Sequence, residues 1–290
     1  MDVTTISVAE RLREKNDELT RAERQLSDTI LRNYPASGLG TITTIAKTAK
    51  VSTPSVARLV QKLGFSGFPD FQAHLRQELN EELSGPIAKR ERWANDAPKG
   101  HILNRFTEAV IDNISQSLRE IDPSEFDETC ALLSDPKRRI FIVGGRITHS
   151  LSDYFFLHMQ VMRKKVTHIT SSSNTWPHYL LDVEEGDIVV IFDVRRYENS
   201  TLKLAEMAKQ KGAEIILFTD EWNSPISQHA RHCLKSRIAV PSAWDSNVNC
   251  MLLAEIVIAS VQEHHWDSTK ERMQELEHMF DQTRFFRKFS

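Results

Sequence analysis

Apolar residues in the first third of the chain recur at helical spacing. Within 42–49, and again within 53–63, they recur at intervals of three and four residues, which places them on one face of a short amphipathic helix. Longer stripes of the same kind occupy 19–34 and 71–82. The chain before residue 84 is therefore predicted to be all-α. The apolar positions of the two short helices are Ile42, Ile45, Ala46 and Ala49, then Val56, Leu59, Val60 and Leu63.

The hydrophobic pattern changes at residue 139, where short apolar runs begin to alternate with helical stretches. Strands that are apolar on both faces and separated by helices form a parallel sheet covered on each side. We therefore predict a three-layer, flavodoxin-like α/β domain, which binds ligands where loops converge at the carboxyl ends of its strands. The predicted strands are 140–143, 166–169, 188–192, 215–219 and a weaker 233–234, and the predicted helices are 101–121, 126–133, 149–163, 199–211 and 248–263.

A tight turn joins the two short helices. Ser52 is placed to cap the second helix, because its hydroxyl can accept a hydrogen bond from the backbone N–H of Ser55. Pro54 is tolerated in a first helical turn, and Gly64 ends the helix. This arrangement is typical of a helix-turn-helix, although paired short helices also occur in proteins that never bind nucleic acid.

Basic charge is concentrated on these two helices. The formal net charge of the chain is -3, yet 42–68 carries four basic residues and no acidic one, which favours contact with DNA. The first residues of a recognition helix meet base edges, so Thr53, Ser55 and Arg58 are candidates for readout, and the lysines are candidates for phosphate contacts. The candidate DNA-binding residues are Thr43, Lys47, Lys50, Ser52, Thr53, Pro54, Ser55, Arg58 and Lys62.

Residues 19–79 resemble the N-terminal domain of the RpiR family of bacterial transcriptional regulators. The most specific piece is VSTPSVARLVQKLGFSGFPDF, in which a capped helix is followed by LGF-x-GF. The chain departs from the family pattern at Lys50, where such turns often carry glycine, so we expect Lys50 in a left-handed conformation at some energetic cost. The resemblance implies a DNA-binding regulator, more commonly a repressor than an activator.

The composition fits a soluble, multi-domain protein. At 290 residues, with 40% hydrophobic and 27% charged residues, the chain can bury two cores. We expect no secretory signal, no membrane span and reduced thiols at its three cysteines, hence a cytoplasmic protein. The expected divisions are a DNA-binding domain at 1–83, a linker at 84–100, an α/β domain at 101–265 and a helical tail at 266–290. The apolar tail favours a subunit contact over membrane contact.

The α/β half resembles a SIS (sugar isomerase) domain, most clearly in LAEMAKQKGAEIILFTDEWNSPISQHA. The resemblance covers about 105–264 and implies that the loops after the strands bind a phosphorylated sugar through hydroxyls and backbone amides. However, DVRRYE at 193–198 stands where the family carries its Ser-x-Ser-Gly-x-Thr loop, and Arg146 and Thr148 replace a Gly and a Ser. The candidate effector-binding residues are Gly145, Arg146, Thr148, Ser171, Ser172, Asp193, Arg195, Arg196 and Glu198.

These replacements allow two interpretations. In the first, the guanidinium groups of Arg146, Arg195 and Arg196 converge on a carboxylate or phosphate of a small anionic metabolite, with Asp193 and Glu198 orienting them. In the second, the charged residues pair with one another, and the SIS domain serves only for oligomerisation.

A sugar-phosphate isomerase is the alternative of a different class, but no spacing of Glu or His singles out a catalytic base. The sequence predicts no enzyme, no metal site and no cofactor. We expect a homodimer or homotetramer that binds a palindromic operator in double-stranded DNA, because two-fold protein symmetry imposes two-fold symmetry on its site. Effector binding and DNA binding would then be reciprocally coupled.

Overall fold

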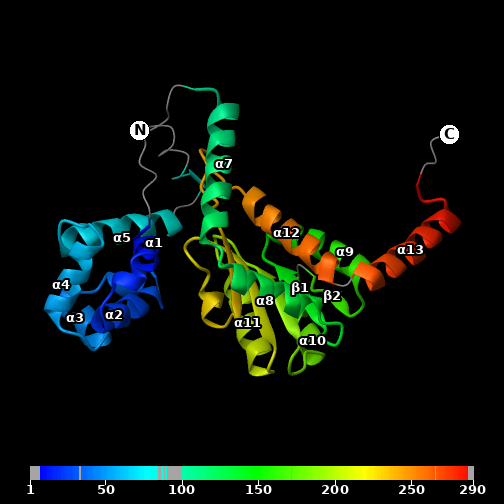
Figure 1. Ribbon diagram of the computed structural model, residues 1–290, viewed down its shortest axis with the longest axis horizontal. Helices are drawn as coiled ribbons and strands as arrows, with labels where there is room; N and C mark the ends of the chain where they lie inside the picture. The colour runs from blue at the N-terminus through cyan, green and yellow to red at the C-terminus, as the bar shows by residue number, and fades with distance from the viewer. Residues whose placement is uncertain are drawn as a thin grey trace. The chain divides into compact units, whose positions relative to one another are not determined.

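The computed structural model of the chain describes residues 7–32, 34–83, 86–87, 89, 100–170, 172–264 and 266–286. It divides into two compact units, Met1–Asn95 and Asp96–Ser290 (Figure 1). Most of the expected linker at 84–100 lies outside the described residues. The first unit is all-α and the second is α/β, as the hydrophobic pattern predicted.

The first unit is a cluster of short helices with defined caps. Ser7 and Thr20 each form a capping box, with Glu10 and Glu23 respectively. The box at Thr20 confirms the predicted start of the second helix. The helices are α1 (Val8–Glu14), α2 (Arg21–Leu31), α3 (Ile42–Thr48), α4 (Thr53–Lys62) and α5 (Phe68–Leu83), with short 3-10 turns at Asn16–Glu18 and Ala36–Gly38.

The core of this unit contains the apolar stripes read from the sequence. The stripe of α4 is fully buried, with Val56, Leu59 and Val60 each at most 1% exposed. Phe65 and Phe71 close the core from the C-terminal side, with ring centroids 5.5 Å apart in an edge-to-face arrangement. Burial of these side chains fixes α4 against the rest of the unit, so its opposite face is presented to solvent at a defined angle.

The second unit contains a five-stranded, wholly parallel sheet in the order β2-β1-β3-β4-β5. The order reverses between β1 and β3, so the carboxyl ends of these two strands form the switch point at which such sheets bind ligands. The strands are β1 (Ile140–Gly144), β2 (Val166–His168), β3 (Ile188–Phe192), β4 (Glu214–Asp220) and β5 (His232–Ser236).

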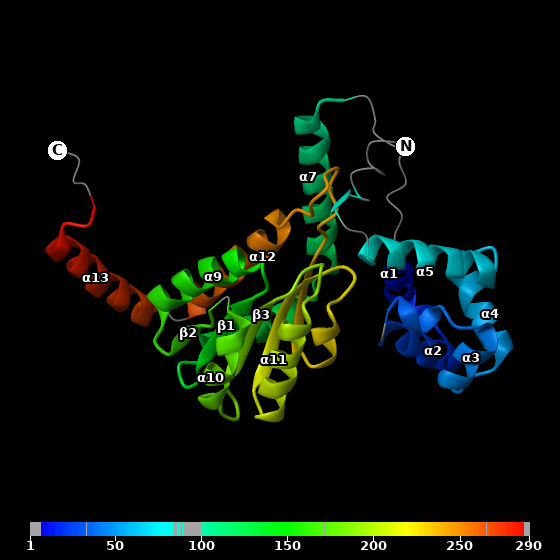
Figure 2. The same cartoon turned by 180° about the vertical axis from the view of Figure 1, so that it is seen from behind.

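Helices cover both faces of this sheet (Figures 1 and 2). Alternate residues of each strand point to opposite faces. Ile140 and Ile142 pack with α8, α9 and α12, whereas Phe141 and Val143 pack with α10 and α11. The helices of this unit are α7 (Ile102–Glu120), α8 (Pro123–Ser134), α9 (His149–Met162), α10 (Trp176–Leu181), α11 (Asn199–Gln210), α12 (Val248–His264) and α13 (Trp266–Thr283).

Two helices of the second unit lie outside its main layers. Ser117 is the one fully buried residue of α7, and Thr269 is the one fully buried residue of α13 within its described helix. The predicted helical tail is present as α13, which packs against α9. Its outward side chains include Trp266, Met273 and Met279, each more than a third exposed.

Candidate functional site

The turn between α3 and α4 has the conformation that the sequence suggested. Lys50 has a φ of +52°, in the left-handed region, and its side chain is exposed. The backbone N–H of Val51 donates to the carbonyl of Ala46 at 2.9 Å, which closes the end of α3. Holding a lysine here costs about 1 kcal/mol relative to an ordinary conformation.

The first turn of α4 is organised by hydroxyl groups. The Ser52 hydroxyl accepts from the backbone N–H of Ser55 at 3.3 Å, which confirms the predicted cap, and the two hydroxyls lie 2.9 Å apart. Arg58 donates from Nη2 to the Ser55 hydroxyl at 3.3 Å. Ser55 is only 6% exposed, so its hydroxyl positions Arg58 rather than reaching a base itself.

The remaining candidates for DNA contact fall into two groups. Lys62 is half-buried, and its ammonium donates to Glu23 at 2.8 Å and to the Glu18 carbonyl at 3.0 Å. The expected phosphate contact of Lys62 is therefore corrected to an internal ion pair. Thr53 is half-buried, and the candidates with exposed side chains are Thr43, Lys47, Lys50, Ser52, Pro54 and Arg58.

The ion pair between Lys62 and Glu23 ties α4 to α2. Burial by itself would raise the pKa of Glu23, but the hydrogen bonds from Lys62 and Thr20 outweigh it and lower that pKa. Arg11 supports the C-terminal end of α4 from α1, because Nη1 donates to the Leu63 carbonyl at 3.2 Å and the guanidinium lies 4.6 Å from the centre of the Phe65 ring. These contacts join residues 39 and 52 positions apart, and the local sequence pattern gave no sign of them.

In the second unit, Thr148 joins the two strands at the switch point. Its hydroxyl accepts from the N–H of Gly145 at 2.9 Å and donates to the Phe192 carbonyl at 2.6 Å. Thr148 is 5% exposed. Its hydroxyl is therefore used to hold the loop after β1 against the end of β3, which corrects its expected role as a ligand contact.

Glu198 lies on the loop after β3, and its carboxylate contacts the loop after β1. Glu198 precedes α11, but it makes no side-chain cap to that helix. Its Oε1 instead accepts from the backbone N–H of Arg146 at 2.7 Å. A Cβ atom at Gly145 would lie 3.1 Å from this oxygen, so the glycine gives the carboxylate room to approach.

Arg195 is held by partners within the second unit. Its Nη2 and Nε donate to the two oxygens of Asp245 at 2.6 and 3.2 Å, and its guanidinium lies 3.9 Å from the centre of the Trp222 ring. Burial by itself would lower the pKa of Arg195, but the bonds and charge of Asp245 raise it. The expectation that Arg195 binds a ligand is therefore corrected. Its guanidinium is paired with Asp245, and the Arg195 side chain is only 4% exposed.

Asp193 is also turned inward. It is 2% exposed, and it accepts hydrogen bonds from the hydroxyls of Ser224 and Thr201. Burial, opposed by the bond from Ser224 and reinforced by the charge of Asp220, raises the pKa of Asp193 to about 7. Asp220 is itself buried, where it accepts from the N–H of Arg195 at 2.7 Å and from the Tyr197 hydroxyl at 2.6 Å.

Three of the candidate effector residues keep exposed side chains. Arg146 and Arg196 are exposed, and neither guanidinium has a partner in the part of the chain that the structure describes. Ser172 is exposed as well, whereas Ser171 lies outside the described residues. The loops therefore combine an internally paired set, at Asp193, Arg195 and Glu198, with two outward-facing cations.

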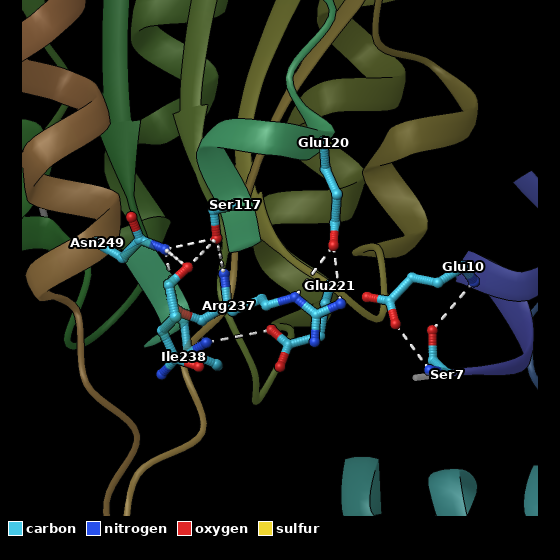
Figure 3. A network of polar contacts seen from close by, with 9 residues as sticks. Ser7, Glu10, Ser117, Glu120, Glu221, Arg237, Ile238 and Asn249 are labelled. Atoms are coloured by element: carbon cyan, nitrogen blue, oxygen red, sulfur yellow. Dashed lines mark hydrogen bonds and ion pairs between the residues drawn. The ribbon is translucent and has the colours of Figure 1, made fainter. Parts of the chain in front are cut away.

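A polar network fastens α7 to the loop that follows β5 (Figure 3). The Asn249 amide donates to the Ser117 hydroxyl at 2.6 Å, and that hydroxyl accepts from the N–H of Arg237 at 2.9 Å. The Arg237 guanidinium donates to Glu120 at 2.8 Å. We call these residues the α7 clamp. The loop that carries Arg237 also carries Asp245, so the clamp and the partner of Arg195 lie on one segment.

Two family models match the chain. The model described as "Helix-turn-helix domain, rpiR family" matches residues 6–82, and the model described as "SIS domain" matches residues 132–260. Together they identify both halves of the molecule. The chain belongs to the RpiR family. Its helix-turn-helix is formed by α3 and α4, and its SIS domain contains the five-stranded sheet.

Relatives of this RpiR-family protein include HTH-type transcriptional regulators. The HTH-type transcriptional regulator HexR of Pseudomonas aeruginosa is 23% identical over 260 residues, which cover 88% of this chain and 86% of HexR. Among solved structures, an RpiR transcription factor from Sphaerobacter thermophilus (sugar isomerase domain) has a TM-score of 0.57 at 18% identity, covering 61% of this chain and 97% of that one. The NanR protein of Vibrio vulnificus, complexed with ManNAc-6P, has a TM-score of 0.55 at 18% identity, covering 95% and 98%.

Two kinds of feature are absent from the part of this RpiR-family chain that the structure describes. Among the helices that the structure describes, none has the length and hydrophobicity needed to cross a bilayer. The described residues also contain no group of three or more His, Cys, Asp or Glu side chains placed to hold a metal ion.

Proposed function

We propose that this RpiR-family protein is a DNA-binding transcriptional repressor whose SIS domain senses an anionic, sugar-type or other acidic metabolite. The observation that carries the proposal is the outward face of α4, where Arg58 is held by Ser55 beside the exposed Lys47 and Lys50. We assign DNA binding to residues 1–83, a linker to 84–100, effector sensing to 101–265 and a subunit contact to the tail at 266–290.

On DNA, α4 would lie in the major groove. Arg58 and Thr53 would then reach base edges, while Lys47 and Lys50 neutralise phosphates on the flanking backbone. A homodimer or homotetramer presents such helices in symmetric pairs, which is why we expect a palindromic operator. Glu23 and Lys62 would contribute indirectly by holding α4 at its angle.

In the SIS domain, the exposed Arg146 and Arg196 are the groups we assign to the acidic part of the effector. The solved complex of the NanR protein with ManNAc-6P supports a sugar phosphate as one candidate class. We further propose that the α7 clamp carries the signal. Effector binding at the loop that carries Arg195 would move Asp245. The segment that carries Asp245 also carries Arg237, which bonds to α7, and α7 directly follows the linker in the sequence.

Binding of the purified protein to operator DNA tests the first part. The operator is selected from a pool of random duplexes, and affinity is measured by fluorescence anisotropy at two salt concentrations. Arg58→Ala should weaken specific binding by about 1–3 kcal/mol, or roughly 5- to 150-fold. Arg21→Ala on the exposed surface of α2 is the matched control and should bind like the wild type. Selection of no preferred sequence, or equal binding by the Arg58 variant, would contradict the proposal.

The internal pairing of Asp193, Arg195 and Glu198 favours a second candidate, in which the SIS domain serves only for oligomerisation. A thermal-shift screen of sugar phosphates and acidic metabolites separates the two candidates. A compound that stabilises the protein and changes its DNA affinity supports sensing. Oligomers that persist while every compound leaves both properties unchanged support the second candidate. Turnover of a sugar phosphate would contradict both candidates and identify the SIS domain as an isomerase.

A further inference from the structure

We propose that Glu198 is a specificity-determining residue of the effector site. Its carboxylate accepts the hydrogen bond of the Arg146 backbone N–H in the loop after β1, and it thereby excludes an external phosphate from that N–H. The inference rests on the proposed sensing function of the SIS domain. It goes beyond that function because it assigns a role to one internal contact and restricts how an acidic ligand can bind.

The geometry of Glu198 is that of a bound anion. Its Oε1 accepts from the N–H of Arg146 at 2.7 Å, a distance typical of a charge-assisted hydrogen bond. The adjacent residue is glycine, and the added Cβ of any other residue would come within 3.1 Å of the same oxygen. The loop after β1 therefore provides an N–H donor and an open approach for a negatively charged oxygen, and a side chain of the protein uses both.

Local sequence does not place the carboxylate there. Glu198 stands at the N-cap of α11, where an acidic side chain ordinarily bonds to the first amides of its own helix. It makes no such cap. Among the described residues, its second oxygen has only a long contact, 3.4 Å from the Ser200 hydroxyl. The carboxylate is thus held mainly by the neighbouring loop, 52 residues away in sequence.

An incoming phosphate would meet this carboxylate as a like charge. Thr148 adds no free donor, because its hydroxyl proton is given to the Phe192 carbonyl. The cations left for a ligand are the exposed side chains of Arg146 and Arg196. An acidic effector would therefore place its phosphate or carboxylate against these guanidinium groups, and it would direct a hydroxyl or amino group, a hydrogen-bond donor, toward Glu198.

The test is a gain of function with inorganic phosphate as the probe. Phosphate is titrated into the full chain by isothermal calorimetry, with thermal stability followed in parallel. We expect Glu198→Ala to bind phosphate at least about ten-fold more tightly than the wild type, because the amide is vacated and the repulsion removed. Glu198→Gln keeps an acceptor for the Arg146 amide without the charge, so its affinity should be intermediate. Glu206→Ala, on the same helix, is the control and should behave like the wild type.

Two results would overturn the proposal. One is wild-type protein that binds phosphate as tightly as both variants. The other is loss of stability in Glu198→Ala with no gain of phosphate affinity in either variant, which would give Glu198 a structural role alone. If the alanine variant does not fold, as judged by circular dichroism, the glutamine variant decides. None of these measurements involves DNA or the natural effector, so failure of the proposed regulatory function would be recorded separately by the operator assay.

Discussion

Replacing Asp193 by asparagine should change how the stability of the SIS domain depends on pH. Asp193 is a buried carboxyl at the end of β3 whose pKa is raised to about 7, because burial and the charge of Asp220 outweigh the hydrogen bond from Ser224. The Thr201 hydroxyl makes only a long contact with Asp193, at 3.4 Å, because it also donates to the Glu198 carbonyl at 2.7 Å. Burial therefore favours the neutral acid over the carboxylate up to about pH 7.

The sign and size of the effect follow from the two pKa values. Between the ordinary value of 3.8 and about 7, the folded protein holds a proton at Asp193 that the unfolded chain has lost. The free energy of unfolding therefore falls as pH rises through this window, and the whole cost, about 4 kcal/mol, is present above it. Asparagine carries no such cost but loses part of one hydrogen bond, about 1 kcal/mol. Asp193→Asn should thus be about 3 kcal/mol more stable than the wild type near pH 8 and slightly less stable near pH 4.

Urea unfolding monitored by tryptophan fluorescence measures this difference. Trp176, Trp222, Trp244 and Trp266 all belong to the SIS unit, so the signal reports mainly on that domain. Asp182→Asn, at an exposed carboxyl, is the control for general charge effects. Parallel stability curves for the Asp193 variant and the wild type across this pH range would refute the assignment of a neutral, buried acid.

Two further predictions concern the helix-turn-helix. Lys50→Gly relieves the left-handed strain of about 1 kcal/mol but gives the unfolded chain more conformational freedom, so the free energy of unfolding should change little. The slope of log DNA affinity against log salt concentration should fall by about one, because a phosphate contact is lost. An unchanged slope would argue against that contact. Lys62→Ala should lower the stability of the helical unit by about 1 kcal/mol in calorimetry, with smaller effects on DNA affinity than Arg58→Ala. Because the folded pKa of Glu23 is lowered, this loss should shrink as pH falls through that pKa, and a loss independent of pH would exclude the ion pair as its cause.

Periodicity predicted the helices and strands because each signal is local. The stripe of α4, the cap at Ser52 and the four apolar runs of the central sheet depend on residues within one turn or one strand of each other. The prediction fell short where polar residues interrupt the pattern. β5 runs from His232 to Ser236 and alternates buried with half-buried residues, so only Cys233 and Leu234 were predicted. The short α10 was not predicted, since six residues with a proline in the first turn give no periodicity.

The candidate sites were harder to predict because their charges are satisfied by distant partners. Sequence reasoning grouped Arg146, Arg195 and Arg196 as ligand-binding cations, but it could not foresee that Asp245, 50 residues beyond Arg195, returns to pair with it. The same holds for Lys62, whose carboxylate partner lies on α2. Loop position predicts that a residue lies near a site. Whether its side chain remains free depends on where the other loops return.

The way in which α7 is attached should allow this helix to open locally while the rest of the SIS domain stays folded. This helix runs for 19 residues, yet the residue it buries is Ser117, and the clamp that holds it is polar. Its apolar side chains, including Phe106, Val110 and Ile114, are only half-buried, so its opening should cost less than global unfolding. We expect its amides to exchange with deuterium well before those of the sheet. We therefore expect the segment that follows the linker to detach and reattach while the five-stranded sheet stays folded.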